Sequence, residues 1–163
     1  MLREGRTGGE NLLERIATKE ARVGVLGLGY VGLPLGLAFA EAGFPAFGLD
    51  VDLSKIESLR KGKSYIRHIS SEPIARLVSE QRFHLSADLS ELASCDAILI
   101  CVPTPLNESR EPNLEYVRSS AAAISAALRP GQLVVLESTT YPGTTEEVLK
   151  PILESSGLQA GVD

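Results

Sequence analysis

The sequence predicts a doubly wound α/β fold, in which a mostly parallel sheet carries helices on both faces. Strand and helix patterns alternate along most of the 163 residues, as they do in successive β-α-β units. The strands expected at 22–27 and 97–102 are apolar throughout, apart from Arg22 at the start of the first, which is typical of strands buried on both faces. A glycine-rich turn separates the first of these strands from a long apolar helix. These observations favour one domain with a central parallel sheet.

The first 20 residues are predicted to form an extension outside that domain. The apolar residues between Leu12 and Ala17 share one face of a helix expected over 11–20. We expect this short helix to pack against the domain, which we place at residues 21–163.

The domain itself alternates strands with helices. Strands are predicted over residues 22–27, 44–50, 82–85, 97–102 and 133–136. Helices are predicted over residues 30–42, 53–59, 72–80, 88–93, 114–128 and 144–153. Asp52 is expected to cap one helix and Gly43 to end another. Thr144 and Glu147 have the spacing of a capping box, and Pro151 is expected to kink the last helix.

Composition and charge exclude some classes of partner. The 16 basic and 21 acidic residues give a net charge of -5, and the chain has no Trp. Without a Lys/Arg stripe, the chain does not resemble a protein that binds phosphate backbones, so we expect no nucleic-acid partner. An uncharged stretch covers residues 23–40, but five glycines and Pro34 interrupt it. We therefore expect a buried strand, turn and helix there and no membrane span.

Both cysteines, Cys95 and Cys101, fall in one apolar run that is predicted to be a strand. Two cysteines six residues apart on a strand cannot form a disulfide with each other. Since the N-terminus lacks an apolar signal core, we expect a reducing compartment, the cytoplasm. Neither His68 nor His84 has a partner at metal-ligand spacing, so no metal is expected.

The turn between the first strand and first helix has the sequence G-x-G-x-x-G, formed by Gly27, Leu28, Gly29, Tyr30, Val31 and Gly32. Gly27 suits the tight turn, Gly29 lets the main chain approach a pyrophosphate, and Gly32 lets the helix pack closely on the strand. The free N–H groups and the helix dipole then favour an anion. Taken alone the pattern is weak, because glycines also occur in turns that bind nothing.

Asp50 strengthens the interpretation, because it lies 21 residues beyond Gly29 at the end of the second predicted strand. A carboxylate at this position can accept hydrogen bonds from both hydroxyls of an adenosine ribose and repels a 2′-phosphate. Asp52 already serves as the helix cap, so Asp50 is free for this role. The sequence therefore predicts NAD rather than NADP as cofactor.

Three further features are expected at the same edge of the sheet, where the parallel strands end. Lys55 lies one turn into the second predicted helix, where it either assists at the adenosine or is simply solvated. Two loops, at 102–105 and 137–143, follow other predicted strands. Open parallel sheets bind ligands at that edge, although spacing alone indicates only turn chemistry for these loops.

Four ordered motifs resemble the UDP-glucose/GDP-mannose dehydrogenase family along nearly the whole chain. They are VGVLGLGYVGLPLGLAFAEAGF, GLDVD, CVPTPLNESREPNLEYV and LESTTYPGTTEEVL. The SYIRHI and STTYPGTT segments are more similar to the branch that oxidises UDP-N-acetylhexosamines than to the UDP-glucose branch. The resemblance implies a Rossmann domain that binds NAD and serves the oxidation of a UDP-sugar at C6.

The resemblance also implies roles for individual residues. The turn at 27–32 would hold the NAD diphosphate, with Asp50 and Lys55 at the adenosine ribose. Val102, Pro103 and Thr104 would line the cofactor cleft, and Ser138, Thr139 and Thr140 would flank the nicotinamide. Thr139 would be catalytic, helping to hold the water or the reacting sugar oxygen.

The family's remaining catalytic groups are expected beyond Asp163. They include a cysteine that forms a thiohemiacetal and a thioester while two NAD are consumed. Cys95 and Cys101 do not match that nucleophile motif, so we interpret both as structural. We therefore expect the fragment to bind NAD without oxidising a sugar.

Two other functions remain open on the sequence alone. A stand-alone NAD sensor would share the glycine turn but would not need a hydroxyl such as that of Thr139 at the nicotinamide end. An NAD-dependent hydroxy-acid dehydrogenase would share the fold but is not expected to carry STTYPG. In a sheet ordered 3-2-1-4-5-6 the chain is truncated before the last strand, which leaves the strand at 133–136 as an open edge. We expect a homo-oligomer.

Overall fold

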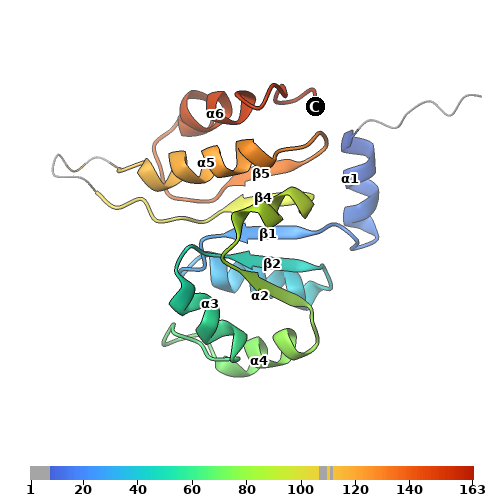
Figure 1. The fold of residues 1–163 in the computed structure, drawn as a ribbon, viewed down its shortest axis with the longest axis vertical. Coiled ribbons are helices and arrows are strands. Elements are labelled where there is room, and N and C mark those ends of the chain that lie inside the picture. The colour runs from blue at the N-terminus through green and yellow to red at the C-terminus, as the bar shows by residue number, and fades with distance from the viewer. Residues whose placement is uncertain (1–7, 107–109, 111) are drawn as a thin grey trace, which may run out of the picture.

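The computed structural model describes residues 8–106, 110 and 112–163. Five parallel strands form one sheet in the order β3-β2-β1-β4-β5, with helices on both sides (Figure 1). The strands are β1 (Val23–Leu26), β2 (Ala46–Leu49), β3 (Phe83–Ser86), β4 (Ala97–Ile100) and β5 (Leu133–Leu136). This arrangement confirms the doubly wound α/β fold, and the strand order is the predicted one.

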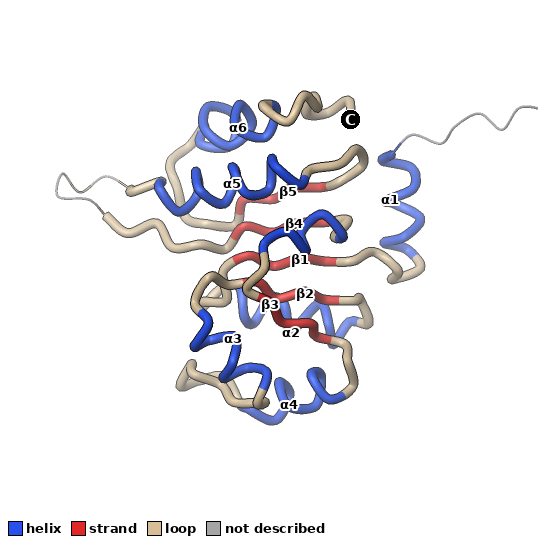
Figure 2. Tube along the Cα trace, viewed as in Figure 1, coloured by secondary structure: helices blue, strands red, loops and turns tan. Residues whose placement is uncertain are grey.

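The helices surround the strands, as the separate colours of Figure 2 show. They are α1 (Gly8–Ala17), α2 (Gly32–Ala42), α3 (Leu53–Arg60), α4 (Ser71–Ser79), α5 (Glu115–Ala127) and α6 (Lys150–Glu154). A 3₁₀ helix, η1 (Leu89–Ser94), lies between β3 and β4, and a π-helix, η2 (Thr145–Leu149), precedes α6. No helix in the described part of the chain combines the length and hydrophobicity that crossing a membrane requires.

The two larger of three apolar clusters among the described residues fill the space between the sheet and its helices. On one face the cluster joins β1 with α2, α3 and α4, through residues such as Val25, Leu33 and Ile74. On the other face Leu26 and Ile100 pack with η1, α5 and η2. The sheet is therefore buried on both faces at its centre, and its ligand-accessible parts are the strand ends.

Local signals in the sequence set several helix ends. The Asp52 side chain accepts a hydrogen bond from the Ser54 N–H at 2.9 Å and begins α3, as predicted. Gly43 has a φ of 100° and ends α2 in the left-handed conformation, which a residue without a Cβ adopts at little cost.

The capping box predicted for the last helix is wrong. Thr144 already has helical backbone angles, and its hydroxyl donates to the Tyr141 carbonyl at 2.8 Å. The turn that follows is a π-helix, in which the Lys150 N–H donates to the Thr145 carbonyl. Pro151 has no N–H to continue the ordinary pattern, so the helix changes register at this point and α6 begins at Lys150.

The extension forms a helix, but the expected packing of its apolar face is wrong. The Leu13 and Ile16 side chains of α1 are 69% and 39% exposed. Instead a polar contact connects α1 to the domain, because Arg15 Nη1 lies 2.7 Å from the Asp96 carboxylate. The helical periodicity of the sequence predicted the helix correctly but could not show what lies beside it.

Cys95 also differs from its predicted place. It follows η1 and precedes β4, whereas Cys101 comes directly after β4. Both thiols are nevertheless buried and free.

The outer edge of β3 is occupied by a charged side chain. Arg60, at the end of α3, donates to the Leu85 carbonyl from Nε at 3.1 Å and from Nη2 at 2.7 Å. The guanidinium thus donates to a carbonyl that could otherwise accept a hydrogen bond from the N–H of a further strand.

Candidate functional site

The strand register brings the predicted site residues to one edge of the sheet. Leu26 pairs with Leu49 on one side and with Ile100 on the other, and Ile100 pairs with Leu136. The loops that follow these four strands therefore begin side by side, at spacings of about 4.8 Å. The chain order reverses between β1 and β4, so this edge is the topological switch point at which open sheets bind ligands.

The turn after β1 has its shape because two of its glycines have no room for a side chain. A Cβ on Gly32 would lie 1.9 Å from the Gly27 carbonyl oxygen. Gly27 has a φ of +95°, and its Cβ would lie 2.8 Å from the Cys101 carbonyl oxygen. These close approaches hold α2 against β1 and the turn against β4, as predicted from the motif.

Gly29 differs from the other two glycines of the motif. A Cβ at Gly29 would meet no atom within 4 Å, and the residue is outside the left-handed region. Packing therefore does not require a glycine at this position. The space above it is open to a ligand that approaches the main chain closely.

Three consecutive N–H donors of the turn have no partner among the described residues, whereas those of Gly27 and Leu28 donate to Leu49 and Asp50. No described residue accepts a hydrogen bond from the N–H groups of Gly29, Tyr30 or Val31. The helical pattern begins when the Leu33 N–H donates to the Gly29 carbonyl at 3.1 Å. Free N–H groups at the start of α2, together with its dipole, suit a diphosphate.

Asp50 connects the end of β2 to the same turn. It is 5% exposed, and its Oδ2 accepts from the Leu28 N–H at 2.9 Å and from Lys55 Nζ at 2.9 Å. Its Oδ1 accepts from the Asp52 N–H at 3.0 Å. Because a carboxylate accepts about four hydrogen bonds, about one position remains for a ribose hydroxyl. Binding of a second hydroxyl at Asp50 would require Lys55 Nζ to move away from the carboxylate.

The loops after β4 and β5 are held together by two hydroxyls. Thr104 Oγ1 donates to the Thr139 carbonyl at 2.6 Å, and Ser138 Oγ donates to the Val102 carbonyl at 2.6 Å. Thr104 and Ser138 therefore position the loops. The Thr139 side chain is exposed, and in the described part of the chain its hydroxyl has no hydrogen-bond partner. Of the three hydroxyls named here, that of Thr139 is the one available to a reactant.

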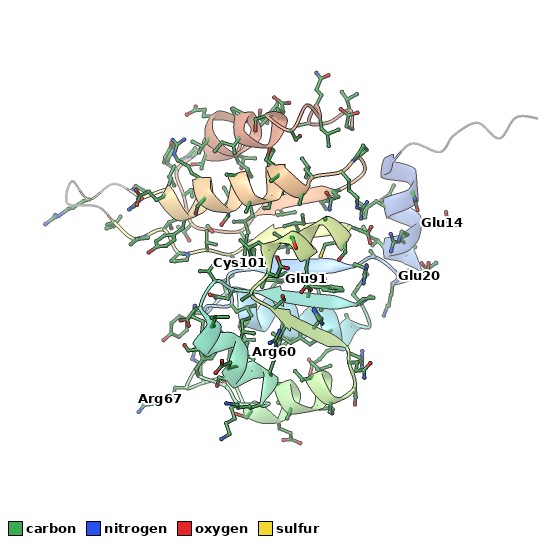
Figure 3. The ribbon with its side chains drawn as sticks, viewed as in Figure 1. Glu14, Glu20, Arg60, Arg67, Glu91 and Cys101 are labelled. Atoms are coloured by element: carbon green, nitrogen blue, oxygen red, sulfur yellow. The ribbon has the colours of Figure 1, made fainter. Side chains whose placement is uncertain are left out.

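The loop between α3 and α4 also reaches this site, which sequence reasoning missed. Tyr65 donates a hydrogen bond to the Leu28 carbonyl, and the His68 ring stacks on Tyr30 with centroids 5.8 Å apart. The parallel pairing of β2 and β3 shows only that the connection between them leaves the carboxyl edge of the sheet and returns to the opposite edge. That signal does not single out Tyr65 or His68. Arg67, in the same loop, extends away from the body of the fold (Figure 3).

The cysteines are poorly suited to nucleophilic chemistry. Burial raises the pKa of the Cys95 thiol to about 11 and that of the Cys101 thiol to about 11. Cys101 lies inside the fold, near the carboxyl edge of the sheet (Figure 3). At neutral pH both thiols are protonated and shielded, so they serve packing. Among the described residues no group of three or more His, Cys, Asp or Glu could hold a metal ion.

Together the fold and the edge define a dinucleotide-binding domain. A parallel sheet with a switch point, free N–H groups at the start of a helix and a buried carboxylate after the second strand are features of domains that bind dinucleotides. The chain belongs to the UDP-glucose/GDP-mannose dehydrogenase family, because residues 21–163 match the NAD binding domain of that family. NAD is the cofactor of this domain, and the residues at the edge of the sheet fit it.

Curated relatives agree with the branch expected from the motifs. The chain is 35% identical over 146 residues to UDP-N-acetyl-D-glucosamine 6-dehydrogenase of Pseudomonas aeruginosa, covering 89% of this chain and 34% of that protein. It is 37% identical over 134 residues to UDP-N-acetyl-D-mannosamine dehydrogenase of Campylobacter jejuni, covering 82% and 32%. The chain thus spans about a third of the length of the curated relatives it matches.

Solved structures show the same fold. NDP-N-acetyl-D-galactosaminuronic acid dehydrogenase of Methanosarcina mazei superimposes with a TM-score of 0.85 at 33% identity, covering 98% of this chain and 36% of that one. GDP-mannose dehydrogenase of Pseudomonas aeruginosa, solved as a ternary complex, gives 0.83 at 31% identity, covering 87% and 34%. The likeness extends over the whole described sheet.

Proposed function

We propose that this chain is the cofactor-binding part of an enzyme that oxidises the C6 alcohol of a UDP-N-acetylhexosamine to the carboxylate. The observation that carries the proposal is Thr139, an exposed hydroxyl without a described partner at the switch point, on a loop held by Thr104 and Ser138. The relatives named UDP-N-acetyl-D-glucosamine 6-dehydrogenase and UDP-N-acetyl-D-mannosamine dehydrogenase support the substrate class. Oxidation of an alcohol to an acid removes four electrons, and NAD supplies a two-electron hydride acceptor, so each product consumes two NAD.

In this proposal each part of the edge has one task. The free N–H groups of the turn at 27–32 bind the diphosphate, and Asp50 with Lys55 binds the adenosine ribose. Val102, Pro103 and Thr104 line the cofactor cleft. Ser138 and Thr140 flank the nicotinamide, and Thr139 orients the sugar oxygen or a water. Residues 1–20 form an extension, and residues 21–163 form the NAD domain. The proposed compartment is the cytoplasm.

We expect the 163-residue chain alone to bind NAD but to form no NADH with UDP-N-acetylglucosamine, UDP-N-acetylmannosamine or UDP-glucose. Hydride transfer needs the sugar carbon held in near-attack geometry, and this edge supplies one wall of such a site. Completion to the acid also needs an accessible thiolate, which neither Cys95 nor Cys101 provides. The measurement is NADH absorbance. Turnover that disappears in a Cys95→Ser, Cys101→Ser double variant would show that the cysteines are catalytic.

A chimera tests the proposed activity directly. Residues 21–163 replace the matching part of the Pseudomonas aeruginosa UDP-N-acetyl-D-glucosamine 6-dehydrogenase, and NADH formation is followed with UDP-N-acetylglucosamine. The chimera should be active, and Thr139→Ala should lower its kcat at least about tenfold, as loss of a positioned catalytic hydroxyl does. Thr145→Ala, an exposed threonine of η2, is the matched control. A chimera that binds NAD without forming NADH would favour an NAD sensor.

We also expect the chain to self-associate through the edge of β5. This strand is the last of the described sheet, Leu133 is 44% exposed, and a cavity of about 250 Å³ lies beside it. An open apolar edge recruits further strands or partners. Light scattering against concentration measures the effect, with Leu133→Lys as the variant that should reduce it. A monodisperse monomer at high concentration would contradict this expectation.

A further inference from the structure

The loop over residues 61–70 contacts the glycine turn at two residues, Leu28 and Tyr30, which flank Gly29. Tyr65 donates to the carbonyl of Leu28, and His68 stacks on the ring of Tyr30, with an interplanar angle of 17°. Tyr65 is 37% exposed, so about two thirds of its surface is covered by the fold. Residues far apart in the sequence thus hold both sides of Gly29.

The Leu28 backbone is held at both its polar groups. Its N–H donates to Asp50 Oδ2 at 2.9 Å, and its carbonyl accepts from the Tyr65 hydroxyl. In a trans peptide the carbonyl and the N–H of the next residue point in opposite directions within one plane. Fixing the Leu28 carbonyl therefore fixes the direction of the Gly29 N–H.

That N–H is one of the free donors of the turn. No described residue accepts from it, and the space above Gly29 is open. A donor held in the bound direction before the ligand arrives costs less free energy to order on binding. Burial, together with the Asp50 and Asp52 carboxylates, raises the pKa of Tyr65, so its hydroxyl keeps its proton and donates throughout the neutral range.

We propose that Tyr65 is a positioning residue for the cofactor diphosphate, holding the Leu28–Gly29 peptide so that the Gly29 N–H faces the phosphate. Tyr65 does not itself touch the cofactor in this proposal. The His68 ring supports the same loop by stacking on Tyr30. The inference rests on the proposed placement of the diphosphate at the turn and extends it to a loop outside the glycine motif.

The test uses Tyr65→Phe, which keeps the ring and removes the hydroxyl. NAD and ADP should bind about three- to tenfold more weakly, the range expected for one hydrogen bond. Adenosine, which has no diphosphate, should bind the variant as it binds the wild-type chain. Calorimetry measures NAD and ADP, and NMR titration measures adenosine. The Gly29 amide resonance should move in the ligand-free variant.

Tyr116→Phe is the matched control, because this half-exposed tyrosine of α5 has no assigned role. It should leave all three affinities and the Gly29 resonance unchanged. Equal weakening of NAD and adenosine in Tyr65→Phe would mean a general structural role and would overturn the inference, as would unchanged NAD and ADP affinities. A wild-type chain that binds no NAD would instead overturn the proposed cofactor site, and the inference with it.

Discussion

Replacement of Gly29 by valine is expected to abolish NAD binding while the domain stays folded. A Cβ at this position meets no atom within 4 Å, and the backbone is not in the left-handed region. The valine methyl groups would instead fill the open space through which the diphosphate reaches the free N–H groups of the turn. Loss of several hydrogen bonds to a charged group weakens binding on the order of 100-fold or more, about 3 kcal/mol.

Calorimetric titration with NAD and circular dichroism together separate binding from folding. Ala38→Val, at an exposed position of α2, should bind NAD normally. Gly32→Ala should behave in the opposite way and lower the melting temperature, because its Cβ would lie 1.9 Å from the Gly27 carbonyl oxygen. A folded Gly29→Val variant with wild-type affinity would show that the diphosphate does not approach this residue.

Asp50→Ala is expected to weaken NAD by roughly 1 to 3 kcal/mol, the range for charge-assisted hydrogen bonds. The substitution removes the carboxylate that serves the ribose, and it also leaves the Leu28 N–H and Lys55 Nζ without this acceptor. The turn therefore loses an anchor at the same time as the ribose loses a partner.

Measuring the affinities of the wild-type chain and of Asp50→Ala for both NAD and NADP separates the loss at the ribose from the loss of the anchor of the turn. The wild-type chain should prefer NAD, because a 2′-phosphate would be placed against Asp50. Asp50→Ala should narrow that preference, since Lys55 becomes free to pair with the extra phosphate. Asp52→Ala is the control: it removes the cap of α3 and should leave the ratio of the two affinities unchanged. Equal affinity of the wild-type chain for NAD and NADP would remove Asp50 from the ribose site.

The sequence predicted the parts of the fold that depend on short-range signals. Continuous apolar strands, the Asp52 cap and Gly43 each determine structure through neighbouring residues, and the structure has them as expected. The prediction of how α1 packs was wrong because the spacing of apolar residues shows which face of a helix is apolar but not which surface, if any, covers that face. The predicted cap at Thr144 was wrong because Thr144 already has helical backbone angles and its hydroxyl donates to the Tyr141 carbonyl instead.

The part of the site that a single sequence motif contains could be predicted. Gly27, Gly32 and Asp50 lie in positions that follow from a strand, a turn and a helix in order. The contact between Tyr65 and Leu28 joins residues 37 positions apart, and no local pattern encodes such a contact. The hydroxyls of Thr104 and Ser138 form hydrogen bonds between the two loops, whereas that of Thr139 does not. The sequence could not show this difference, because it depends on how the two loops lie against each other.

The guanidinium of Arg60 on the outer strand makes the two sides of the sheet unequal. With the Leu85 carbonyl occupied, pairing of a further strand with β3 is hindered, whereas no described side chain forms a hydrogen bond with the backbone of β5. If two copies meet through β5 about a two-fold axis, each contributes the same surface and the joined sheet ends in two protected margins. Such an assembly closes as a dimer, whereas a chain with two open margins can polymerise into fibres.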